Sequence, residues 1–369
     1  MLDYHQRVFY VVVILSCSLL LSACNRSGSG ELASAPTLVA TALPLPTAIP
    51  TATPEPLPPT FTPMPTLASS VTPRTASTIS PSPSIILATP TAIHAESAGA
   101  LATVAPLRLV PGRPQGYLSR FRLVAFYGVP SGPELGVLGA PPREMMVDQL
   151  RGVAAQYQGL GNDRLVLPAF HMVTTIADPF PGDYGRYSHW VREETIAEWV
   201  ETASQLDIAV ILDIQPGYAD LQLEIDRLEP FLYEPHVHLA VDPEFLMHNR
   251  AIPGREVGYM DGTQINAVQR RLEQVAVEIG LNKVLIIHQF DTPMVREKAG
   301  IEDFPHVELV MDADGFGSPE AKIGDYRQYA AEPGFEYGGF KLFFGWDAPL
   351  MTPAGVMDLD PLPAVIIYQ

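Results

Sequence analysis

Polar side chains, most of them carboxylic acids, occur two positions apart at the ends of three apolar runs. They are Asp213 with Gln215, Asp242 with Glu244, and Asp312 with Asp314. Residues two apart on an extended chain project from the same face, and ionised groups cannot face an apolar layer, so each pair is expected at an open end of the fold. Carboxyl groups crowded into one cleft repel one another, which raises some pKa values and leaves other groups ionised.

This division into protonated and ionised carboxyls is what hydrolysis by a general acid and a partner base or nucleophile requires. We therefore take four acids as candidate catalytic residues. Glu244 or Asp242 would be the general acid, and Asp213 or Asp312 would be the base or nucleophile.

Further polar residues end or follow the apolar runs, and we expect them to bind substrate hydroxyls or to position a carboxylate. They are Tyr127, His171, Gln215, His288, Gln289, Asp314, Lys341 and Tyr368. Metal binding by the two histidines and the acids is an alternative. No HxH or HExxH spacing supports it, so neither a metal nor a cofactor is predicted.

Each of these residues also has an ordinary structural explanation. Asp242-Pro243 and Asp314-Gly315 are common turn dipeptides, and an aspartate after a strand often caps the next helix. His171 and His288 could be buried structural histidines, and Lys341 could neutralise a carboxylate for stability alone. The functional interpretation therefore depends on the whole set meeting at one place.

The elements that would bring them together are eight short apolar runs separated by helix-like patterns. The predicted strands are 123–127, 165–170, 208–214, 237–241, 284–290, 307–311, 340–344 and 365–368. The predicted helices are 143–157, 192–205, 218–228, 263–279, 293–299, 318–331 and 353–357. Continuous apolar strands that alternate with helices indicate a parallel sheet buried on both faces.

Eight such units predict an α/β fold, a single-domain (β/α)8 TIM barrel spanning residues 106–369. In this fold the carboxyl ends of the strands form the active-site mouth, which is where the polar residues gather. The rival is an open doubly wound sheet, but the first strand lacks the Gly-rich turn of nucleotide binders. No eighth helix follows the last strand, and residues 107–121 could take its place.

The amino-terminal segment predicts export. Val8 to Leu21 is an apolar run too short to span a membrane comfortably, and it ends in Leu21-Ser22-Ala23-Cys24. We interpret residues 1–23 as a lipoprotein signal peptide and Cys24 as the lipidated residue. The alternatives are an ordinary secretory peptide or an anchor helix. The other cysteine, Cys17, lies within the signal peptide, so the exported domain would contain neither a disulfide nor a thiolate site.

Composition separates a linker from the folded domain. Residues 24–105 are rich in Thr, Pro, Ala and Ser, which predicts a disordered, extended tether. Of the net charge of −18, −17 belongs to residues 106–369, which contain 20 Lys and Arg against 37 Asp and Glu. Such a charge disfavours nucleic acid as a partner and disfavours direct adhesion to anionic lipid, which leaves the lipid anchor as the membrane contact. A monomer is expected.

The phrases Ile211-Leu212-Asp213-Ile214-Gln215-Pro216-Gly217, Leu239-Ala240-Val241-Asp242-Pro243-Glu244, Ile287-His288-Gln289-Phe290 and Met311-Asp312-Ala313-Asp314-Gly315 place polar groups at strand ends. In this pattern the domain resembles bacterial lipoproteins with a glycoside-hydrolase-like barrel. The resemblance implies action outside the membrane on cell-surface or environmental carbohydrate. The Asn-Glu pair that many retaining barrel glycosidases carry after strand four is replaced by Pro243-Glu244. A non-catalytic receptor for glycan or cell wall, and a metal-dependent hydrolase, are the alternatives.

Overall fold

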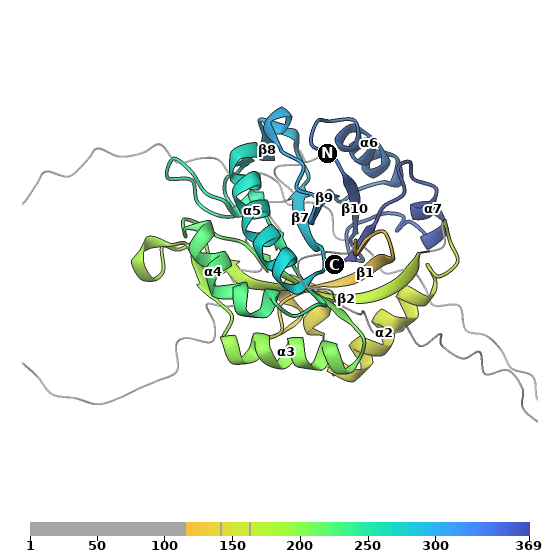
Figure 1. Cartoon of the computed structure of the whole chain (residues 1–369). Coiled ribbons are helices and arrows are strands. Elements are labelled where there is room, and N and C mark those ends of the chain that lie inside the picture. Colours follow the sequence, from red (N-terminus) through yellow and green to blue (C-terminus); the bar gives the residue numbers. More distant parts are fainter. Residues whose placement is uncertain (1–115, 141, 162–163) are drawn as a thin grey trace, which may run out of the picture. The chain divides into compact units, whose positions relative to one another are not determined.

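Eight parallel strands form a closed barrel, because the first strand pairs with both the second and the last (Figure 1). The computed structural model describes residues 116–140, 142–161 and 164–369. The barrel strands are β1 (Phe121–Gly128), β2 (Leu165–Ala177), β4 (Ala209–Ile214), β5 (Val237–Val241), β7 (Lys283–Gln289), β9 (Val307–Ala313), β10 (Tyr337–Leu342) and β11 (Val365–Tyr368). All eight predicted strands are found, and the predicted TIM barrel is confirmed.

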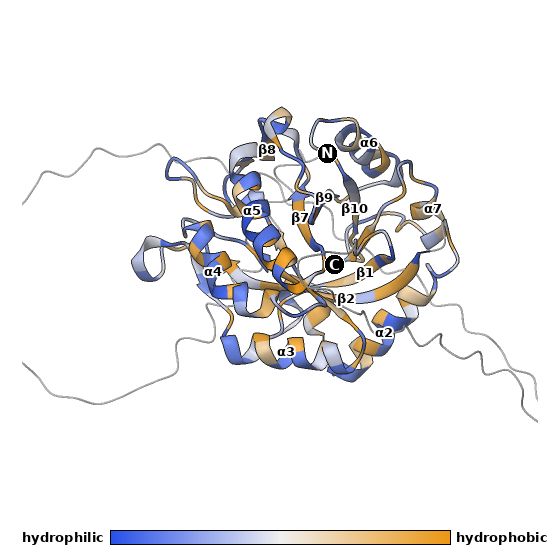
Figure 2. Ribbon diagram, viewed as in Figure 1, coloured by the Kyte–Doolittle hydropathy of each residue, from blue (hydrophilic) through white to orange (hydrophobic). Residues whose placement is uncertain are grey.

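Helices surround the strands and turn their polar faces outward (Figures 1 and 2). They are α2 (Arg143–Ala155), α3 (Glu193–Gln205), α4 (Leu221–Leu232), α5 (Gly262–Ile279), α6 (Pro319–Ala330) and α7 (Pro353–Met357). Their starts follow local chemistry: Asp220 caps α4, and Asp261 forms a capping box with Gln264 at α5. The apolar faces of these helices pack on the outside of the barrel.

The predicted helix at 293–299 is wrong. The segment after β7 forms two 3-10 turns, η5 (Thr292–Met294) and η6 (Lys298–Gly300), separated by the short strand β8 (Val295–Arg296). Two features prevent a helix: β8 pairs with β6 (Met260–Asp261), and Glu297 has a left-handed backbone with φ of 51°. The loops after β5 and β7 are thereby tied together beside the mouth.

Alternation along each strand divides the buried residues into two layers. One layer, which includes Leu123, Ala125, Ile211 and Ile286, fills the barrel interior. The other packs between the strands and the helices. The interior side chains in the middle of the strands are apolar, and the interior positions near the strand ends carry the polar groups described below. The barrel therefore positions the site through strand parity.

The amino-terminal end of the barrel is closed by the chain that precedes β1. The backbone N–H groups of Tyr117 and Leu118 donate to the buried carboxylate of Glu308 at distances of 2.8 to 3.0 Å, and the Tyr117 ring packs edge-on against His238. His238 is thus structural, since it packs against Tyr117 and its Nδ1 accepts the backbone N–H of Val284 at 3.3 Å. Residues 116–121, the described part of the segment 107–121, cover the amino-terminal end of the barrel. They do not take the place of an eighth helix.

The predicted signal peptide (1–23), Cys24, the linker (24–105) and the first residues of the predicted domain lie outside the described residues. Among the helices of residues 116–140, 142–161 and 164–369, none is long and apolar enough to cross a membrane.

Candidate active site

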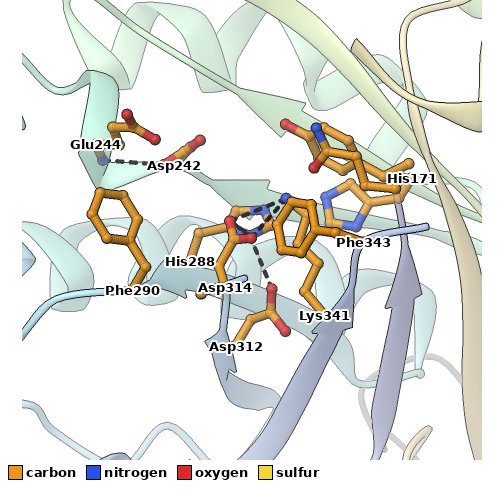
Figure 3. Close-up of polar contacts among 12 residues, drawn as sticks. His171, Asp242, Glu244, His288, Phe290, Asp312, Asp314, Lys341 and Phe343 are labelled. Atoms are coloured by element: carbon orange, nitrogen blue, oxygen red, sulfur yellow. Dashed lines mark hydrogen bonds and ion pairs between the residues drawn. The ribbon is translucent and has the colours of Figure 1, made fainter. Parts of the chain in front are cut away.

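Eight polar side chains from six strands and their following loops meet at the carboxyl-terminal end of the barrel. They are Tyr127 of β1, His171 of β2, Asp213 and Gln215 of β4 and its loop, His288 of β7, Asp312 and Asp314 of β9 and its loop, and Lys341 of β10. We call these eight residues the mouth cluster. Asp242 and Glu244, which follow β5, lie beside it (Figure 3). The sequence predicted each of these ten residues.

His288 connects most of the acids. Its Nδ1 lies 3.0 Å from Asp312 Oδ2 and 3.1 Å from Asp314 Oδ2, and its Nε2 lies 3.3 Å from Asp213 Oδ2. Burial opposes a charge on this fully buried imidazole, but the attraction of Asp213, followed by that of Asp312 and Asp314, outweighs burial and raises the pKa of His288 well above its ordinary value.

Asp213 lies between two imidazoles. Its Oδ2 is 3.4 Å from His171 Nε2 and 3.3 Å from His288 Nε2, and all three side chains are completely buried. Burial would raise the pKa of Asp213, but the charge on His288 and the contact with His171 overcome it and hold the pKa well below the usual range. Asp213 is thus an ionised carboxylate that is completely buried in the barrel interior.

Lys341 neutralises the opposite side of the cluster. Its Nζ lies 3.0 Å from each carboxylate oxygen of Asp314 and 3.8 Å from the centre of the Tyr127 ring. Despite burial, the attraction of Asp314 raises the pKa of Lys341, and Lys341 together with His288 lowers that of Asp314. Gln215 completes this side, since its amide donates to the Tyr127 hydroxyl at 3.2 Å.

The pKa values of Asp242 and Glu244 are both raised, in contrast to those of Asp213 and Asp314. Burial, followed by repulsion from Asp213 and Asp314, raises the pKa of Asp242 to about 7, although His288 and Lys341 act against the shift. Burial and the neighbouring Asp242 raise the pKa of Glu244 well above its ordinary value. Asp242 also accepts the backbone N–H of Glu244 at 3.1 Å, so it has the capping role that its turn dipeptide predicts as well.

Two predicted binding residues are not brought into the cluster. Gln289 follows the interior residue His288, so its side chain points outward, where it accepts from Lys298 at 2.6 Å. Tyr368 faces the helix layer, and its hydroxyl hydrogen-bonds that of Tyr157 at 2.7 Å. Their side chains support the barrel wall and its loops, not the mouth.

Other residues at the mouth were missed. Phe290 and Phe343 directly follow β7 and β10 and flank the polar cluster (Figure 3). They were missed because the predicted strands 284–290 and 340–344 included both as apolar strand residues. Lys322 was also missed, because it lies in helix α6. Its Nζ donates to the carbonyl of Lys341 at 2.8 Å and lies 3.2 Å from Asp347, so it joins the helix to the loop after β10.

Glycine at two positions makes room for polar side chains. A Cβ on Gly339, the interior residue before Lys341, would lie 2.7 Å from Asp312 Oδ1. A Cβ on Gly338 would lie 2.0 Å from the Tyr326 hydroxyl. The pair of glycines in β10 therefore allows Asp312 and Tyr326 to approach the strand from its two faces.

Two sets of donors could hold a metal ion in the described part of the chain. One is His171, Asp213 and His288, and the other is His288, Asp312 and Asp314. In each set the ligand atoms lie within 4.8 Å of one another.

The chain matches no family model, and no curated protein or solved structure is significantly similar to it. What the site can do therefore rests on its own geometry.

Proposed function

We propose that this protein is a lipid-anchored, extracytoplasmic hydrolase that cleaves carbohydrate by acid–base chemistry. The observation that carries the proposal is the division of the carboxyl groups in one barrel mouth. Asp242 and Glu244 have raised pKa values, whereas Asp213 and Asp314 have lowered ones. Environments that separate the pKa values of neighbouring carboxyls assign one group as the acid and the other as the base.

Glu244 is the better placed general acid. It is partly exposed, whereas Asp242 is 4% exposed and is held by its cap bond to the Glu244 backbone. A protonated Glu244 can donate its proton to the oxygen of the leaving sugar as the glycosidic C–O bond breaks. Asp242 is largely neutral below about pH 7, so it adds little negative charge next to Glu244.

The ionised side of the cluster activates water. Asp213 is the better placed base, since neither of its oxygens has a hydrogen-bond partner of good geometry within the described residues. The water oxygen bonds to the anomeric carbon and its proton passes to the carboxylate, so that one water is consumed per bond cleaved. His288 and Lys341 balance the charge of the acids during this step.

Aromatic side chains at the rim support carbohydrate as the substrate. Trp346 follows β10 and is 50% exposed. The Trp346 ring lies 5.8 Å from that of Phe316, which follows β9. Flat aromatic faces next to buried acids suit the apolar faces and hydroxyl edges of sugars.

The proposal is tested by incubating the purified protein with a panel of glycans and aryl glycosides and measuring released reducing sugar or aryl alcohol. Turnover that depends on the carboxyls of the site is expected. Saturable binding to a glycan without turnover would contradict the hydrolase and favour the receptor alternative.

The rate of hydrolysis is expected to fall at alkaline pH, because the general acid must be protonated. Burial, followed by repulsion from Asp242 and Asp314, raises the pKa of the proposed acid Glu244 well above its ordinary value, although Lys341 and His288 act against the shift. Above that pKa, each further pH unit should lower kcat by up to tenfold. A pH profile of kcat measures this. A rate that keeps rising through pH 9 would contradict a carboxylic acid as the proton donor.

Replacing Cys24 with Ala is expected to release the protein from the membrane fraction into the medium. The reason is that the lipobox cysteine would carry the only acyl anchor, and the acidic domain is repelled by anionic lipid. Immunoblots of membrane and medium fractions measure the change, with Cys17→Ala as the matched control. An unchanged membrane fraction for the Cys24 variant would contradict lipidation.

A further inference from the structure

We infer that His171, Asp213 and His288 form a binding site for one divalent transition-metal ion, with Zn²⁺ as the best fit. The three residues extend from β2, β4 and β7, and each side chain is fully buried in the barrel interior. The inference rests on the arrangement of the ligand atoms. It stands whether or not the proposed substrate is correct.

The spacing of the donor atoms matches a tetrahedral metal site. Zn²⁺ binds imidazole nitrogen and carboxylate oxygen at about 2.0 to 2.2 Å, so two ligands of a tetrahedron are about 3.3 to 3.6 Å apart. Asp213 Oδ2 is 3.4 Å from His171 Nε2 and 3.3 Å from His288 Nε2. All three ligand atoms lie within 4.8 Å of one another, close enough to share one ion.

The same atoms are not used by hydrogen bonds. Although the distances are short, the geometry is poor for hydrogen bonding. Across the described residues, His171 Nε2, His288 Nε2 and both oxygens of Asp213 have no hydrogen-bond partner. Buried polar atoms without partners are costly, and a metal ion would satisfy them together. If the two histidines had only a structural role, these nitrogens would be expected to form hydrogen bonds.

The rest of the cluster completes this site and argues against the second donor set. His288 Nδ1 lies 3.0 Å from Asp312, which is the outer carboxylate that commonly orients a metal-binding imidazole. Asp314, by contrast, is already paired with Lys341. A cation at His288, Asp312 and Asp314 would have to compete with that ammonium group. The first set is therefore the metal site.

A three-ligand site leaves a fourth position for water. Metal-bound water loses a proton far more readily than free water, so the ion would supply a hydroxide nucleophile beside the carboxyl groups of Asp242 and Glu244. With such a nucleophile, the site could hydrolyse any class of bond that is cleaved by attack of hydroxide.

The test measures metal binding directly. The mature protein, purified without chelator, is assayed for metals by mass spectrometry, then stripped with EDTA and titrated with Zn²⁺ by calorimetry and with Co²⁺ by visible absorption. We expect one equivalent of metal per chain and the intense visible bands of tetrahedral Co²⁺. Binding of less than a tenth of an equivalent on both titrations would overturn the inference.

Variants locate the site. His171→Gln and Asp213→Asn are each expected to weaken Zn²⁺ binding by more than 100-fold, and Asp312→Asn, outside the ligand set, by about 10- to 100-fold. His189→Gln is the matched control, because His189 pairs with Asp178 at 2.7 Å on the surface and should not affect binding. Circular dichroism shows which variants fold. Full affinity in folded His171→Gln or Asp213→Asn protein would overturn the inference.

The metal site and the proposed function can fail separately. Metal binding without release of sugar from any glycan contradicts only the carbohydrate substrate. Sugar release that persists in metal-free protein, with no Zn²⁺ or Co²⁺ bound in titration, contradicts only the metal.

Discussion

Glu244→Gln is expected to lower kcat for hydrolysis of a natural glycan by about 10²- to 10⁴-fold, because loss of one general acid typically has this effect. Folding should be unaffected, since glutamine has nearly the same size and shape as the protonated carboxyl that it replaces. Glu201→Gln is the matched control. Glu201 is exposed on α3 and its carboxylate is bonded only to Gln205 in the described contacts, so its kcat should equal that of the unmodified protein.

The choice of leaving group distinguishes the role of the acid from the role of the base. An aryl glycoside with an acidic phenol needs no proton as the bond breaks, so Glu244→Gln should cleave it nearly as well as the unmodified protein does. Asp213→Asn should lose activity on both substrates, because its role is on the water side. If Glu244→Gln lowers the melting temperature and leaves kcat unchanged for both substrates, Glu244 is a structural residue and the acid assignment fails.

Lys341→Met is expected to lower the free energy of unfolding by about 3 to 5 kcal/mol, the usual result of removing one partner of a buried ion pair. The Lys341 side chain is 4% exposed and Asp314 is 10% exposed, and the pair is held by two contacts of 3.0 Å. Removing the ammonium group leaves Asp314 ionised near Asp312 and Asp242 with only His288 to balance it. Urea denaturation at neutral pH measures the change.

A surface pair and a double variant are the controls. Asp226→Asn breaks the pair with Arg271, in which the side chains are 52% and 32% exposed, and should cost at most about 1 kcal/mol. Lys341→Met combined with Asp314→Asn should recover much of the lost stability, because the unbalanced charge is gone. A loss below 1 kcal/mol for Lys341→Met alone would mean that the pair is not needed to balance the cluster.

Both predictions depend on the positions of particular strand ends. Most of those positions could be predicted from the sequence. Polar residues that interrupt an apolar run at its end, such as Asp213 and Asp312, can only be accommodated at an open end of the barrel. The boundary of β10 was harder to predict, because Gly338 and Gly339 gave no apolar signal. The structure shows that these glycines admit the side chains of Tyr326 and Asp312.

The errors at Gln289 and Tyr368 have one physical cause. A strand buried on both faces is a continuous apolar run, and such a run carries no alternation that says which residues face inward. In β7 the interior residues end at His288, so Gln289 points outward. In β11 the interior residues are Val365 and Ile367, which turns Tyr368 toward Tyr157.

The sequence by itself determined the alternation of strands and helices, and with it the barrel and the end at which polar groups gather, because burial and backbone pairing follow from local residue pattern. Only the tertiary structure decided which of these groups touch. His171 and His288 approach the same carboxylate, and Lys341 pairs with Asp314. Both arrangements depend on the register of strands that are far apart in the chain. Local sequence does not encode that register, since closure of the whole barrel sets it.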